Sequence, residues 1–164
     1  MKFNYYAFRA MYLHEMDRFR RTLMQSLFSP VLSTSLYFIV FGSVIGGYVE
    51  KIDGISYGSY IVPGLLMLTL LTQSISNTSF GIFFPKFNGT IYEILAAPIS
   101  TFEIVLAFVG AGATKTLIVG VVIFITATFF VEVQVMYPLL MIFLLVLVAF
   151  TFALFGFLIG LMSS

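Results

Sequence analysis

The residues best suited to binding chemistry lie in one short segment, residues 86–100, between two long apolar runs. Thr90 and Glu93 have the spacing of a capping box, in which each side chain bonds the other residue's backbone amide. Gly89 lets the chain bend before this first turn. Pro98 disfavours helical angles in the residue before it. The segment is therefore predicted to be a short ordered helix with a defined start and end.

A second capping box, Ser100 and Glu103, is predicted to start the next long helix. On the short helix, Ile91, Ile94 and Leu95 would form an apolar edge. This edge either lies on the membrane surface or inserts as a knob into a groove of another subunit. The residues alone leave both interpretations open.

The sequence offers little reactive chemistry elsewhere. It contains no cysteine, which excludes disulfides, thiolate metal sites and cysteine nucleophiles. His14 is the only histidine, so we expect no metal site. The pattern Gly-x-x-x-x-Gly-Lys-Ser/Thr of a phosphate-binding loop does not occur. We therefore predict no catalytic residue, no metal and no cofactor bound by this chain.

The composition is that of a membrane protein. Of the 164 residues, 60% are hydrophobic and 9% are charged, whereas soluble domains carry about 25% charged residues. The net charge of +1 is too small to indicate nucleic-acid binding. Four stretches are long enough to cross a bilayer, which takes roughly 20 apolar residues. They are about Leu27–Gly47, Ser59–Phe84, Phe102–Val131 and Pro138–Met162.

The predicted fold is an all-α polytopic membrane helix bundle, a single transmembrane domain over residues 1–164. Residues 1–24 are predicted to form an amphipathic elbow helix at the membrane interface, in contact with membrane lipids. Its apolar face comprises Tyr5, Phe8, Tyr12, Met16, Phe19 and Leu23. This helix is either a plain anchor for the first span or an element that transmits motion from a cytoplasmic partner.

Basic residues predict the orientation. Six of the eight Lys and Arg residues precede the first span or lie between the second and third, at Lys2, Arg9, Arg18, Arg20, Arg21 and Lys86, whereas Lys51 after the first span is offset by Glu50 and Asp53. Because basic loops stay in the cytoplasm, the N-terminus and the 86–100 segment are expected there. The sequence ends on the same side at Ser164 without a charged anchor, as we expect of a truncated product or a fragment.

Polar residues within the spans have two interpretations. Thr69, Thr72, Gln73 and Ser76 share one side of the second span, where they either bond to other helices or line a substrate path. Lys115 is expected to extend its side chain to the inner interface. Two small-residue pairs, Gly42 with Gly46 and Gly156 with Gly160, permit close helix contact but are weak signals.

The 86–100 segment resembles the signature of type-2 ABC exporter permeases. The resemblance rests on Lys86, Phe87, Gly89, Thr90, Ile91, Glu93, Ile94, Leu95, Pro98 and Ser100. Two further stretches, residues 37–42 and 60–65, are also similar to the family. The similarity extends over essentially the whole chain.

The resemblance implies an inner-membrane permease subunit of an ATP-driven exporter of drugs, lipids or glycans. Residues Lys86 to Pro98 would then dock a separate cytoplasmic ABC ATPase that binds ATP and Mg²⁺, with the permease working as a homodimer. Family members have six spans, so this sequence resembles their N-terminal portion. The alternative from the residues alone is a truncated or non-transporting four-span scaffold or assembly protein.

Overall fold

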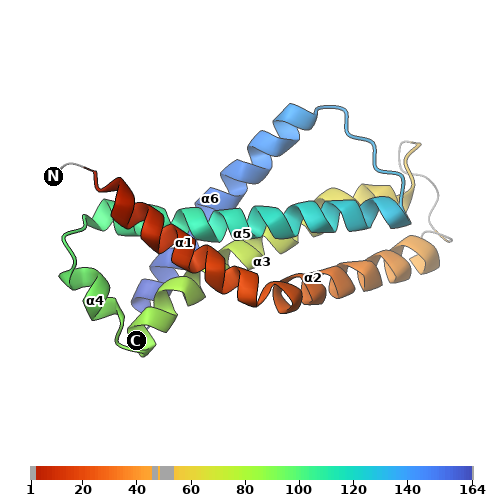
Figure 1. Ribbon diagram of the computed structural model, residues 1–164. Coiled ribbons are helices and arrows are strands. Elements are labelled where there is room, and N and C mark those ends of the chain that lie inside the picture. The colour runs from red at the N-terminus through yellow and green to blue at the C-terminus, as the bar shows by residue number, and fades with distance from the viewer. Residues whose placement is uncertain (1–2, 46–47, 49–53, 164) are drawn as a thin grey trace.

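The computed structural model describes residues 3–45, 48 and 54–163, and the long regular elements in these ranges are helices (Figure 1). In chain order they are α1 (Tyr5–Arg21), α2 (Leu23–Tyr37), the π-helix η1 (Phe38–Ile45), α3 (Tyr57–Phe87), α4 (Ile91–Ala96), α5 (Thr101–Phe130) and α6 (Pro138–Met162). Lys2, Gly46 and Gly47, which enter the sequence interpretation, lie outside the described residues.

Within the described residues, four helices are long and apolar enough to cross a membrane, which confirms the predicted all-α membrane bundle. The first candidate span begins at Leu23 rather than Leu27 and reaches Gly42. It changes from α to π geometry at Phe38, whose buried ring stacks on Phe130 with 6.0 Å between ring centroids. The other spans are α3, α5 and α6.

Local sequence explains where the first helices begin and end. The Asn4 side chain caps α1 by accepting a hydrogen bond from the Ala7 amide at 3.3 Å. Basic residues fill the last turn of α1, where they complement the negative end of the helix dipole. The Thr22 hydroxyl donates to the carbonyl oxygens of Arg18 and Phe19, and α2 starts at the next residue. Thr22 therefore forms a short joint between the interfacial helix and the first span.

The α5 helix is the centre of the bundle. It is the most buried of the four spans and contacts α1, α2, α3 and α6. Figure 1 shows α1 beside the first half of α5, with α2 continuing towards its far end. Small residues such as Ala107, Ala111 and Ala113 are almost fully buried on α5 and let neighbouring helices approach closely.

The α6 helix crosses α3 and diverges from α5 towards its own N-terminus (Figure 1). At the crossing, a Cβ atom placed on Gly156 would lie 2.5 Å from the Ile75 carbonyl oxygen. One placed on Gly160 would lie 2.7 Å from the Ser79 carbonyl oxygen. This small-residue pair therefore makes a real helix contact. Gly42, by contrast, has nothing within 4 Å of such a position.

Candidate functional site

The 86–100 segment folds as a bend, a short helix and a stop. Gly89 adopts φ +77°, a left-handed conformation that favours glycine and turns the chain out of α3. The six-residue helix α4 follows and ends at Ala96, with Ala97 as its C-cap. Ala97 is extended, with ψ 148°, as expected of a residue that precedes a proline. Ser100 then starts α5 with the predicted capping box, both bonds of which are formed.

The first predicted capping box is wrong. Thr90 occupies the N-cap position of α4 but has helical angles, and its side chain makes no capping bond. Its hydroxyl instead donates to the Pro85 carbonyl oxygen at 3.4 Å. Because α4 follows α3 after a single tight turn, the end of α3 supplies an acceptor within reach of Thr90. Glu93 is exposed in the first turn of α4, where its carboxylate interacts favourably with the positive end of the helix dipole.

The apolar edge of α4 is divided between two directions. Ile91 and Ile94 are half-buried and pack against the core cluster formed by α3, α5 and α6. Leu95 and Tyr92 are 64% and 74% exposed, and Phe87 at the end of α3 is 76% exposed. The predicted edge of Ile91, Ile94 and Leu95 is therefore corrected: the two isoleucines hold α4 on the bundle. Phe87, Tyr92 and Leu95 form the exposed apolar surface of this segment.

Lys86 binds the end of another helix. Its ammonium Nζ donates to the carbonyl oxygens of Gly160 at 3.4 Å, Leu161 at 2.7 Å and Ser163. These are terminal carbonyls of α6, which have no partner within their own helix. A cation there also complements the negative end of the helix dipole. Lys86 therefore joins the end of α3 to the end of α6.

The Glu103 carboxylate joins two helices. Its Oε2 accepts a hydrogen bond from the Ser100 amide at 2.9 Å, which completes the cap of α5. Its Oε1 accepts one from the amide of Asn4, the residue that caps α1. Glu103 is buried, so both bonds are shielded from water. One side chain thus fixes the starts of α1 and α5 to each other, directly after α4.

Further along the same contact, a buried ion pair joins α1 to α5. Lys115 Nζ lies 2.7 Å from Glu15 Oε2, and both side chains are 5% exposed. Arg18 Nη1 lies 3.2 Å from the other Glu15 oxygen. The prediction that the Lys115 side chain extends out to the inner interface is therefore corrected: the side chain stays inside the protein, because α1 carries a carboxylate to it. Burial of this lysine would be costly without such a partner.

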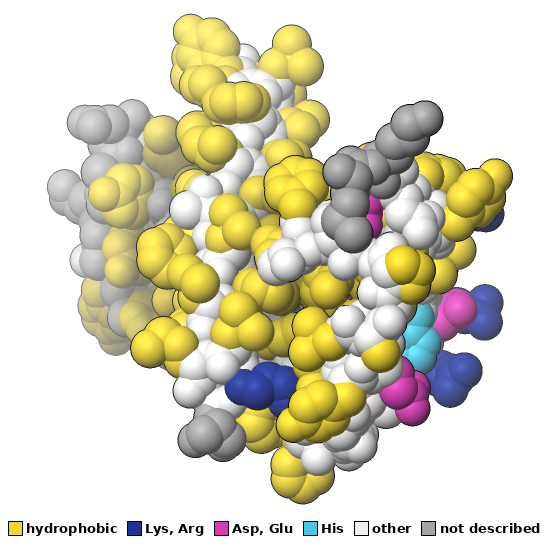
Figure 2. All heavy atoms as spheres, turned by 90° about the vertical axis from the view of Figure 1, so that its left-hand side faces the viewer, with side chains coloured by type: hydrophobic (Ala, Val, Ile, Leu, Met, Phe, Trp, Pro, Cys, Tyr) yellow, Lys and Arg dark blue, Asp and Glu magenta, His cyan; other side chains and the backbone are white. Residues whose placement is uncertain are grey.

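The apolar stripe of α1 does not lie wholly on the membrane surface. Phe19 is buried in the protein, and the Tyr12 hydroxyl donates to Thr114 Oγ1 of α5 at 2.9 Å. Tyr5 is exposed. Figure 2 shows charged side chains gathered at one edge of a face that is otherwise mainly hydrophobic. The helix is therefore packed along α5 as well as amphipathic.

The polar side of α3 is distinct from its packed side. Thr69 and Thr72 donate to carbonyls of their own helix, those of Leu65 and Leu68. Gln73 is half-exposed and Ser76 is exposed. The buried Ser74, by contrast, donates to the Ala149 carbonyl of α6 at 3.1 Å. In the middle of α3 the hydrogen bond to α6 therefore comes from Ser74, and none of the four predicted residues makes it.

A large cavity lies at the end of the bundle opposite α4. Its volume is about 1410 Å³, and its walls come from η1, α3, the end of α5 and the start of α6. Phe38, Leu66 and Leu144 are among the mostly apolar side chains that line it. Such a lining suits an apolar ligand or a packed helix. In the described residues, no group of three or more His, Cys, Asp or Glu side chains could hold a metal ion.

The helical bundle, its four candidate spans and the amphipathic helix α1 packed along α5 define a polytopic membrane protein, and comparison with known proteins gives its family. Residues 6–164 match the ABC-2 type transporter family. The chain is also 37% identical, over 158 residues, to the inner membrane transport permease YadH of Escherichia coli K12. The same values hold for YadH of Shigella flexneri. The chain belongs to the ABC-2 type transporter family.

The alignment covers 96% of this chain and 62% of the curated YadH relatives. The chain therefore spans less than two thirds of the length of these relatives. No solved structure matches the chain.

Proposed function

We propose that this chain is a membrane permease subunit of an ATP-driven ABC exporter in the bacterial inner membrane, and that α4 docks a separate ATPase subunit. The observation that carries the proposal is that some apolar residues of α4 pack on the bundle and others are exposed. Ile91 and Ile94 seat the helix on the bundle, while Tyr92 and Leu95 remain exposed. A helix fixed on one side and apolar on the other suits recognition by a groove. Family membership supports the same reading.

In this proposal the partner chain binds ATP and Mg²⁺, and two permeases form a homodimer that carries two ATPase subunits. Nucleotide can change the state of the permease only if α4 contacts the open and closed ATPase states differently. Movement of α4 reaches α5 through residues 97–100. It reaches α1 through the Glu103 carboxylate, which bonds the Ser100 and Asn4 amides. The amphipathic helix α1 thus acts as a transmitting element.

The substrate path of this proposal includes the polar side of α3. Thr69, Thr72, Gln73 and Ser76 lie away from the contact that α3 makes with α6 through Ser74. Polar side chains within a span are suited to a water-filled cavity or a dimer interface. A drug, a lipid or a glycan all fit a path with so few charges.

Docking is tested by substitutions on the exposed surface of α4. Leu95→Asp and Tyr92→Ala should each reduce the ABC ATPase subunit that copurifies with the chain by about tenfold or more, because both remove apolar contact area at the centre of the interface. Tyr137→Ala is the matched control, since Tyr137 is 69% exposed at the opposite end. Equal retention by Leu95→Asp and Tyr137→Ala would contradict docking at α4. Copurification of non-ATPase partners alone would favour the scaffold alternative.

Orientation is tested with single cysteines, which is straightforward because the chain has none. Glu93→Cys on α4 and Glu132→Cys after α5 are both at exposed positions. In spheroplasts, a membrane-impermeant maleimide should label Glu132→Cys at once and Glu93→Cys only after permeabilisation. Labelling of Glu93→Cys in intact spheroplasts would reject the cytoplasmic position of α4.

A further inference from the structure

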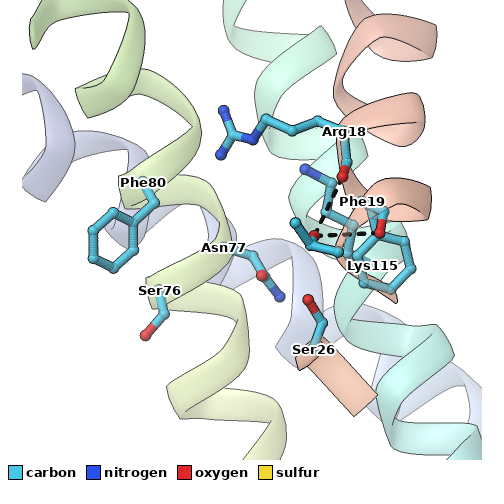
Figure 3. Close-up of a pocket in the computed structure, with 8 residues that line it drawn as sticks. Arg18, Phe19, Ser26, Ser76, Asn77, Phe80 and Lys115 are labelled. Carbon is cyan, nitrogen blue, oxygen red and sulfur yellow. Dashed lines mark hydrogen bonds between the residues drawn. The ribbon is translucent and has the colours of Figure 1, made fainter. Parts of the chain in front are cut away.

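A small polar cavity lies where α1, α2, α3 and α5 meet (Figure 3). Its volume is about 100 Å³, room for a group of several non-hydrogen atoms. Arg18, Thr22 and Ser26 line it from the α1–α2 joint, Asn77 lines it from α3, and Lys115 lines it from α5. In Figure 3, Arg18 extends from α1 towards α3, and Asn77 extends from α3 towards Ser26. The rim is accessible because the Arg18 side chain is 34% exposed, whereas Lys115 is buried.

The charges around this cavity do not balance. Lys115 and Arg18 share one carboxylate, that of Glu15, at 2.7 Å and 3.2 Å. The group of three therefore carries a net charge of +1. The described residues that line the cavity contribute both cations and no carboxylate. Because opposite charges attract more strongly away from bulk water, this excess favours an anion in the cavity.

The donors fit a phosphate. The guanidinium of Arg18 presents a planar fork of N–H groups that matches phosphate oxygens. An ammonium has three donors, of which the bond from Lys115 to Glu15 uses one. Ser26 and Asn77 add a hydroxyl and an amide from opposite walls. A single tetrahedral anion can therefore accept hydrogen bonds from several helices at once.

The position of the cavity selects a lipid as the source of this phosphate. Thr22 lines the cavity, and the first candidate span begins at the next residue, Leu23. The cavity thus lies at the level where the chain enters the membrane, which is the level of the headgroups. Phe19 and Phe80 add apolar walls next to the polar groups. A lipid phosphate with its glycerol would contact both kinds of surface.

We propose that this cavity, which we call the α1–α2 joint site, binds the phosphate of an anionic phospholipid headgroup. The bound lipid bridges Arg18 of α1 to Asn77 of α3 and Lys115 of α5. The site is separate from the exposed surface of α4, so it does not depend on ATPase docking.

The test measures lipid binding to the purified full chain in detergent by native mass spectrometry, with phosphatidylglycerol, phosphatidylcholine and inorganic phosphate as probes. Arg18→Gln should weaken phosphatidylglycerol binding by about tenfold, the loss expected for a hydrogen bond to a charged group. Arg20→Gln is the matched control, because Arg20 is on the same helix with its side chain 80% exposed. Asn77→Leu keeps every charge but replaces the amide in the cavity wall with an apolar side chain, so it should also weaken phosphatidylglycerol binding.

Four outcomes would count against the proposal. Unchanged phosphatidylglycerol affinity in both Arg18→Gln and Asn77→Leu would overturn the site. An equal loss of phosphatidylglycerol affinity in Arg18→Gln and Arg20→Gln would mean that basic residues attract the lipid without a defined site. Inorganic phosphate that binds as tightly as phosphatidylglycerol, with the same dependence on Arg18, would keep a phosphate site but reject the lipid as its source. Phosphatidylcholine binding as tight as that of phosphatidylglycerol would reject the requirement for an anionic headgroup.

Discussion

The contact of α1 with α5 and the contact of α6 with α3 are held together by opposite means. The first consists of polar bonds between residues far apart in the sequence. The bonded pairs are Asn4–Glu103, Tyr12–Thr114 and Glu15–Lys115. The second includes bonds from Ser74 and Lys86 to carbonyls of α6, but its closest approach depends on the absence of side chains, because Gly156 and Gly160 bring α6 against the backbone of α3.

This difference shows two ways to fix helices in a medium where burial of apolar surface gives no preference for one helix partner over lipid. Polar bonds select both the partner and the register, since a shift would leave Lys115 buried without its opposite charge. Glycine contacts gain van der Waals attraction and are sensitive to added volume. The first contact should therefore fail when one partner is removed, and the second when a methyl group is added.

The largest effect is expected where the polar contact loses one charge. Lys115→Met should destabilise the folded chain by about 3 kcal/mol, the lower end of the range for breaking a buried ion pair, because it leaves the buried Glu15 carboxylate with only the partly exposed Arg18 as its partner. The double variant Glu15→Gln, Lys115→Met removes both charges and should recover most of this loss. Thermal unfolding in detergent measures both. A Lys115→Met variant as stable as the wild type would show that the ion pair does not hold α1 on α5.

An intermediate effect is expected at the glycine contact. Gly156→Ala places a Cβ atom 2.5 Å from a backbone oxygen of Ile75, which cannot rotate away. We expect a loss of about 1–3 kcal/mol in stability, the range for overpacking. Gly64→Ala on α3 is the control, because it has nothing within 4 Å. If both variants unfold at the same temperature, α6 is not held by close backbone contact.

The smallest effect is expected for a neutral hydrogen bond in the polar contact. Tyr12→Phe removes the bond to Thr114 but leaves the ring in place. Bonds between membrane helices contribute roughly 0.6 kcal/mol on average, so a loss of that order is expected. Tyr6→Phe serves as the control, since Tyr6 is exposed on the same helix. A loss as large as that of Lys115→Met would mean that hydrogen bonding, rather than charge pairing, dominates this contact.

Much of the fold follows from local sequence. The four spans are visible because each is a long apolar run, and the observed α6 has the predicted bounds Pro138–Met162. The bend at Gly89 and the start of α5 at Ser100 are also local, since each depends on residues within one turn. Docking by α4 and the path on α3 remain predictions.

The rest depends on contacts between distant residues. Nothing near Lys115 in the sequence indicates that Glu15 reaches it, because the two are 100 residues apart. Periodicity gives the apolar residues of α4 but not which of them face the bundle, so Ile91 and Leu95 look equivalent in the sequence. Glu103 is identifiable as a capping residue, yet its second oxygen serves Asn4, 99 residues away.

The same distances have a consequence for the order of assembly during synthesis. Asn4, Tyr12 and Glu15 find their partners 99, 102 and 100 residues later. At about 5–20 residues per second, α1 waits roughly 5–20 s after its own synthesis before Lys115 is made. Through that interval the Glu15 carboxylate can remain hydrated at the membrane surface. The α1 helix is therefore made before α2 and α3 but can reach its final position only after α5 has been made.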